Sequence, residues 1–127
     1  MNDRPDAREL IEIAHDVFAA EVLPAVPDVL RYTVLMIANA MAIAQRELAA
    51  GDAPLRDEYR RLSDLLSETT AALRGEALRA AVETCNRCLA NEIRAGKFDG
   101  DERAAVLEHL RRTTEEKLAV SNPKALI

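Results

Sequence analysis

Two cysteines, Cys85 and Cys88, have the spacing of redox-active and metal-binding cysteine pairs. Zinc needs about four ligands, and the sequence offers only His15 and His109 as further soft ligands. Redox pairs lie at the first turn of a helix, where the dipole lowers the thiol pKa, whereas these cysteines fall in the middle of an expected helix. Core packing is the favoured interpretation, and redox or metal chemistry is the alternative. The sequence predicts no metal and no cofactor.

A carboxylate and an imidazole, Glu12 and His15, have the Glu-x-x-His spacing of helices that bind two metal ions. Such a site needs this motif on two helices and two further glutamates. The second histidine, His109, has Val106 at the matching position, so we expect structural or surface histidines. The sequence has no glycine-rich phosphate loop and no Gly-x-Ser-x-Gly elbow. No catalytic residue is assigned, and enzymatic activity is left open but not favoured.

A single amide, Asn39, lies in the middle of an uncharged run from Tyr32 to Gln45. A buried amide without a partner costs about 1–3 kcal/mol. We therefore expect Asn39 to bond a helix end, another side chain or a ligand. The favoured interpretation is that it fixes the register of neighbouring helices. Arg46 lies two turns further along the same helix face.

Several polar and cationic residues are expected near helix ends. Cations in a last turn stabilise the helix dipole by about 0.3–1 kcal/mol each, which accounts for any one of them alone. Two or three that converge would instead hold a carboxylate or phosphate. The candidate ligand- or partner-binding residues are Asn39, Arg46, Arg94, Lys117 and Asn122.

The elements that must position these residues are all helices. Apolar residues recur at helical spacing, and prolines, glycines and capping residues divide the pattern. Residues 67–75 either continue the third helix or break it. The expected helices cover about 6–22, 28–50, 53–66, 76–95 and 100–120.

The helix over about 28–50 is expected at the centre of the fold. A helix that is apolar on every side has no face left for water, and its uncharged run is too short for a bilayer, which needs about 20 residues. We predict an all-α fold, an antiparallel bundle of four to five helices around this most buried helix, in a single domain over 1–127. The charged face of the third helix should be solvated, with Arg56, Asp57, Arg60, Arg61 and Asp64 on it.

The composition of the chain limits the classes of partner that it is expected to bind. The net charge is −5 and the pI about 5.1, and an acidic surface repels phosphate backbones, so nucleic acid is not expected. No export signal is visible, and two cysteines fit a reduced compartment. We expect a cytoplasmic protein with no membrane association.

Four stretches of the chain together form a recognisable pattern. They are Asp3-Arg4-Pro5-Asp6 with Glu9-Leu10, Ile37-Ala38-Asn39-Ala40-Met41 with Gln45-Arg46-Glu47-Leu48, Leu89 with Ile93-Arg94-Ala95-Gly96 and Asp99, and Lys117-Leu118-Ala119-Val120-Ser121-Asn122-Pro123. Together they resemble one bacterial family of uncharacterised small helical domains, whose members occur beside, or fused to, aminoglycoside-phosphotransferase-like kinases and acyl-CoA dehydrogenases. The resemblance covers nearly the whole chain and supplies no catalytic residues.

The resemblance implies an accessory or interaction domain in acyl-CoA or hydroxy-acid catabolism, with the dehydrogenase or the kinase as partner. The alternative is a binder of a small acyl or anionic intermediate, or a minor enzyme, that uses Asn39, Arg46, Arg94 and Lys117. A homo-oligomer is a third expectation, because Ala-rich helix faces such as that of Ala38 and Ala42 allow close approach between subunits.

Overall fold

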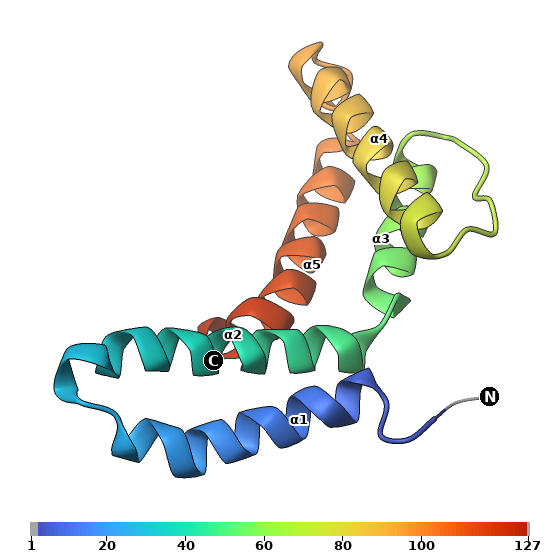
Figure 1. Cartoon of the computed structure of the whole chain (residues 1–127). Helices are drawn as coiled ribbons and strands as arrows, with labels where there is room; N and C mark the ends of the chain where they lie inside the picture. The colour runs from blue at the N-terminus through green and yellow to red at the C-terminus, as the bar shows by residue number, and fades with distance from the viewer. Residues whose placement is uncertain (1–2, 127) are drawn as a thin grey trace. The chain divides into compact units, whose positions relative to one another are not determined.

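The computed structural model describes residues 3–126, and within them all regular structure is helical, which confirms the predicted all-α class (Figure 1). The chain forms two compact units. Unit 1 comprises residues 1–51 and 120–122, and unit 2 comprises residues 52–119 and 123–127. The single-domain organisation expected from the sequence stays a prediction.

Unit 1 is built on an antiparallel pair of helices, α1 (Ala7–Val17) and α2 (Arg31–Ala50), which lie side by side (Figure 1). Asp6 caps α1, since its carboxylate accepts a hydrogen bond from the backbone N–H of Glu9 at 2.9 Å. A π-helical turn (Phe18–Val22) and two 3₁₀ turns (Leu23–Ala25 and Asp28–Leu30) connect the helices. The predicted helix from about 28 thus starts as a 3₁₀ turn.

Burial of α2 differs from the expectation. Val34 is its one fully buried residue among those described, so the prediction that this is the most buried helix is wrong. The reason is that unit 1 places a single long helix beside it. α2 ends at Gly51, whose φ of +60° favours glycine. No described helix is both long and apolar enough to cross a membrane.

Unit 2 contains α3 (Ala53–Leu65), α4 (Gly75–Arg94) and most of α5 (Arg103–Ser121). The ambiguous segment after α3 leaves the helix and returns along it, because the backbone N–H of Gly75 donates to the Asp52 carboxylate at 3.1 Å. The first residues of α3 and α4 therefore lie at the same end. The prediction of antiparallel neighbours is wrong for this pair, since the connection is long enough to run back.

The hydrophobic core of the chain lies in unit 2. Leu62 of α3 and Leu78 of α4 are fully buried. Phe98, in the loop between α4 and α5, closes one end of the core after Gly96 turns the chain at a φ of +82°. The buried cluster consists of Tyr59, Leu62, Leu66, Leu78, Val82, Cys85, Leu89, Phe98 and Val106.

Replacing Leu78 by alanine is expected to lower the free energy of unfolding by about 2–5 kcal/mol, because a buried side chain is lost and a cavity remains. Urea denaturation followed by circular dichroism measures this. Leu107→Ala, at a leucine that is 55% exposed in α5, should change stability by about 0.5 kcal/mol or less. Equal losses in both variants would show that the core is elsewhere.

Candidate functional site

α2 has one covered face and one open face. The covered face carries Val34, which is 7% exposed, and the half-buried Ala38 and Met41. Residues three or four apart share a helix face, and such a set lies on the opposite side of α2 and ends at Asn39. Tyr32 is 75% exposed, Leu35 48% and Met36 49%. We call Tyr32, Leu35, Met36 and Asn39 the open face of α2.

The apolar stripe of α1 is divided in the same way. Ile11 and Phe18 are half-buried. Leu10, Ile13 and Val17 lie beside them on the helix but are about half exposed. The helix pair therefore covers part of each apolar surface and leaves the rest in contact with water.

Asn39 is exposed. Within residues 3–126 its side chain forms no hydrogen bond to another side chain or backbone group. The favoured interpretation, that a buried Asn39 fixes the register of neighbouring helices, is wrong, because α1 covers the other side of the helix. As a partner-binding residue Asn39 stays a prediction, and its place on the open face suits that role.

Arg46 has a defined partner in unit 1. Its Nε donates to the carbonyl oxygen of Val120 at 2.7 Å. Val120 lies in the last turn of α5, where carbonyls lack partners within the helix and a cation is favourable. Arg46 thus acts as a C-terminal cap on a helix other than its own. Asn122, also in unit 1, is exposed.

The other two candidate cations belong to unit 2 and lie apart. Arg94 is the last residue of α4 and donates weakly to Asn91 of the same helix, at 3.4 Å. α4 ends and α5 begins at the same end of unit 2 (Figure 1). Lys117 lies about 21 Å further along α5, at about 1.5 Å per residue from Arg103. Arg94 and Lys117 therefore do not converge on one small ligand.

A polar cluster that the sequence analysis missed joins α3 to α5. The guanidinium of Arg61 forms two hydrogen bonds with the Glu116 carboxylate, at 2.8 and 2.9 Å. It also donates to Thr113 Oγ1 at 3.1 Å and, through Nε, to His109 Nδ1 at 3.2 Å. The Arg61 side chain is 16% exposed, so its placement on a solvated face was wrong.

A buried carboxylate belongs to the same region. Glu58 is 4% exposed, and its Oε1 accepts from the Asn86 amide of α4 at 3.2 Å. The hydrogen bond with Glu116 is the largest of the effects that raise the pKa of Arg61. The negative charges of Glu116 and Glu58 raise it further. Buried charge is tolerated where it is paired and hydrogen-bonded. Arg61 has both in its contact with Glu116, and Glu58 has the hydrogen bond from Asn86. The cluster is a structural link between the three helices of unit 2.

His109 is neutral in this arrangement, because its Nδ1 accepts a hydrogen bond from Arg61. Burial, followed by the charge of Arg61, lowers the pKa of His109. The residue is buried, as expected of a structural histidine. No sequence signal marked Arg61, which stands among the other charged residues of α3. The partner on α5 was not visible in the sequence.

The cysteine pair and the histidine of the sequence motifs have structural surroundings that account for them. Cys85 is buried in the core and Cys88 packs against it, which confirms core packing. Burial raises the pKa of the Cys85 thiol, which disfavours the reactive thiolate. His15 lies 3.7 Å from the carboxylate of Asp16. In the part of the chain that the structure describes, no three His, Cys, Asp or Glu side chains gather as a metal site requires.

The fold and the open face define a small all-α protein with a helix hairpin whose apolar surface is only partly covered. The chain belongs to the family described as Domain of unknown function (DUF6285), which matches residues 24–125. The expected membership of an uncharacterised domain family is thereby confirmed. No curated protein and no solved structure matches the chain.

The lowered pKa of His109 predicts a pH dependence of stability. The folded state disfavours the proton that the unfolded chain binds near the ordinary histidine pKa. The free energy of unfolding should therefore fall as the pH drops from about 7.5 to about 5.5. His109→Gln should flatten this slope in urea denaturation, and His15→Gln, outside the cluster, should retain it. An unchanged slope in His109→Gln would contradict the assignment.

The exposure of Asn39 predicts that Asn39→Leu leaves the free energy of unfolding within about 0.5 kcal/mol of the parent. Thermal and urea denaturation measure this. A loss of more than about 1 kcal/mol would mean that the amide has an internal partner after all.

Proposed function

We propose that the chain is an accessory interaction module whose α1–α2 hairpin binds an apolar helix of a partner protein. The observation that carries this proposal is the open face of α2. Soluble proteins rarely leave contiguous apolar patches exposed without a binding role. A two-helix hairpin also gains little stability from its own contacts, so covering this face stabilises the hairpin as well.

The exposed apolar side chains are concentrated in unit 1. Each half-exposed side chain offers roughly 50 Å² of apolar surface, since full burial is worth about 1.5–3 kcal/mol at about 25 cal/mol per Å². The three apolar residues of the open face supply roughly 150 Å² and the eleven residues of unit 1 together about 500 Å², compared with roughly 800 Å² that one partner gives to a standard interface. The large exposed apolar residues of unit 1 are Leu10, Ile13, Val17, Val22, Val29, Leu30, Tyr32, Leu35, Met36, Ile37 and Leu48.

The chemistry of the open face limits its occupant. No charge lies between Tyr32 and Gln45, so a charged partner surface would lose its hydration without gaining an ion pair. An apolar helix fits, because its side chains pack between those of Tyr32, Leu35 and Met36 at helical spacing. Asn39 then needs one polar group opposite it, which fixes the register of the two helices.

The family resemblance supplies the partner class. Domains of this kind occur beside or fused to acyl-CoA dehydrogenases and aminoglycoside-phosphotransferase-like kinases, and we propose one of these two enzymes as the partner. An accessory role in acyl-CoA or hydroxy-acid catabolism follows from that partnership. The absence of a complete catalytic set in the sequence supports an accessory role over an enzymatic one.

The test is co-expression with the dehydrogenase and the kinase of the same genome, followed by size-exclusion chromatography and calorimetry. The parent chain is expected to elute with one of them. Leu35→Glu should weaken that binding at least tenfold, because it places a charge in an apolar interface. Leu107→Glu is the matched control, since this leucine of α5 is similarly exposed, and it should bind like the parent.

Three outcomes would overturn the proposal. The first is that neither enzyme shifts in elution or activity when the chain is present. The second is that Leu35→Glu destabilises the isolated chain by more than about 1 kcal/mol, which means that the face is already covered. The third is a homodimer that Leu35→Glu dissociates, which makes a second copy the occupant.

A further inference from the structure

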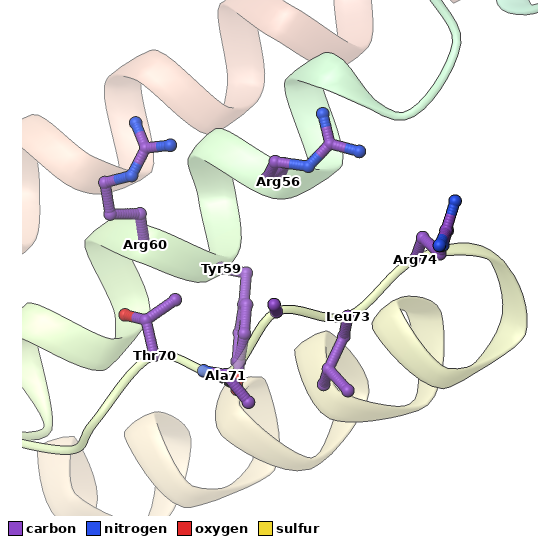
Figure 2. Close-up of a pocket in the computed structure, with 8 residues that line it drawn as sticks. Arg56, Tyr59, Arg60, Thr70, Ala71, Leu73 and Arg74 are labelled. Carbon is purple, nitrogen blue, oxygen red and sulfur yellow. Dashed lines mark hydrogen bonds between the residues drawn. The ribbon is translucent and has the colours of Figure 1, made fainter.

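A second feature of unit 2 lies outside the hairpin and points to a ligand. The segment that returns from α3 to α4 borders a cavity of about 490 Å³ (Figure 2). This volume is within the range of small-molecule sites, about 300–1,000 Å³. Three of its eight lining residues are arginines and none is acidic, although the chain as a whole carries a net charge of −5.

The three arginines come from both walls of the cavity. Arg56 and Arg60 are one helical turn apart on the exposed side of α3, and Arg74 stands just before α4 (Figure 2). Figure 2 shows the guanidinium groups of Arg56 and Arg74 extending to the same side of the returning segment. The cavity thus has guanidinium groups along its rim from two separate elements.

Most of this positive charge is not neutralised within the protein. Arg60 lies 3.4 Å from the Asp57 carboxylate, in an exposed pair that is worth little. Across residues 3–126, Arg56 and Arg74 have no ion pair and no side-chain hydrogen bond. The nearby Asp52 carboxylate accepts from the backbone N–H of Gly75. An anion that enters the cavity therefore meets the guanidinium groups of Arg56 and Arg74 without competition from an ion pair of these two side chains.

The base of the cavity is apolar and held in place. Tyr59, 7% exposed, reaches from α3 to the returning segment, where its hydroxyl accepts from the backbone N–H of Ala71 at 3.4 Å (Figure 2). The N–H of Leu73 donates to the carbonyl of Ala71 at 3.0 Å and tightens the segment. Leu73 packs partly against the core. The lining therefore combines a fixed apolar base, the Thr70 hydroxyl and a cationic rim.

We propose that this cavity binds a small phosphomonoester, with the phosphate held by Arg56 and Arg74 and the organic group on Leu73 and the neighbouring alanines. A phosphate is favoured over a carboxylate because it carries about two charges near neutral pH and accepts forked hydrogen bonds from several guanidinium groups at once. The volume exceeds what a lone phosphate ion fills, which leaves room for the organic group.

The experiment is isothermal titration calorimetry of the full chain with glycerol 2-phosphate, inorganic phosphate and succinate, in low and moderate salt. Glycerol 2-phosphate should bind more tightly than inorganic phosphate, and succinate least tightly. Arg56→Gln and Arg74→Gln should each weaken binding of the monoester about tenfold or more, since a charge-assisted hydrogen bond to phosphate is lost. Arg56→Lys should retain only part of the affinity, because lysine lacks the fork.

Arg87→Gln, at an exposed arginine of α4 outside the cavity, is the matched control and should bind like the parent. Equal weakening in Arg87→Gln would reduce the effect to general charge and overturn the site. So would inorganic phosphate binding as tightly as the monoester, or no measurable binding of either. These variants leave the open face of α2 unchanged, so the outcome is independent of the proposed partner interaction.

Discussion

The segment from Tyr32 to Gln45 carries no charge, and a helix of that composition is stable in water only where apolar surface covers it. The apolar residues of unit 2 are covered, because side chains of α3, α4 and α5 close a core around Leu62 and Leu78. The apolar residues of unit 1 are covered only in part, since α1 covers one face of α2 and leaves Tyr32, Leu35 and Met36 exposed. The apolar surface that remains is the physical reason to look for a partner at the hairpin.

Polar side chains are buried in unit 2 and exposed on the open face of α2 in unit 1. The most buried charges are in unit 2, where Arg61 bonds Glu116 and His109, and Asn86 bonds Glu58. Removing one member of such a cluster leaves an unpaired buried group, which costs more than the cluster itself contributes. The main effect of the cluster is therefore to fix how α3, α4 and α5 pack against one another, and its net contribution to the free energy of unfolding is smaller. Asn39, the polar residue in the middle of the uncharged run of unit 1, is exposed and available to bond a partner.

The sequence predicts the local structure well, because capping and periodicity are local. Asp6, Gly51 and Gly96 stand where the helices begin or end, and Cys85 packs in the core. What it does not predict is which elements meet. The segment of nine residues between α3 and α4 gives no sign that it returns to the start of α3, so the direction of α4 was missed. For the same reason Arg61 was assigned to solvent, since its partners are about fifty residues away in the chain.

The net charge of the chain likewise does not show where in the fold its charges lie. An acidic chain repels phosphate as a whole, yet the potential at a cavity depends on which charges lie within about a Debye length, 8–10 Å at physiological salt. Many carboxylates are already engaged elsewhere: Glu108 and Glu115 with Arg111, Glu92 with Lys97, and Glu116 with Arg61. The returning segment places Arg74 on the lining of the cavity that two arginines of α3 also line, and this lining contains no acidic residue. A fold can thus build an anion site in a chain whose composition argues against one, and the feature that the sequence left ambiguous is the one that forms it.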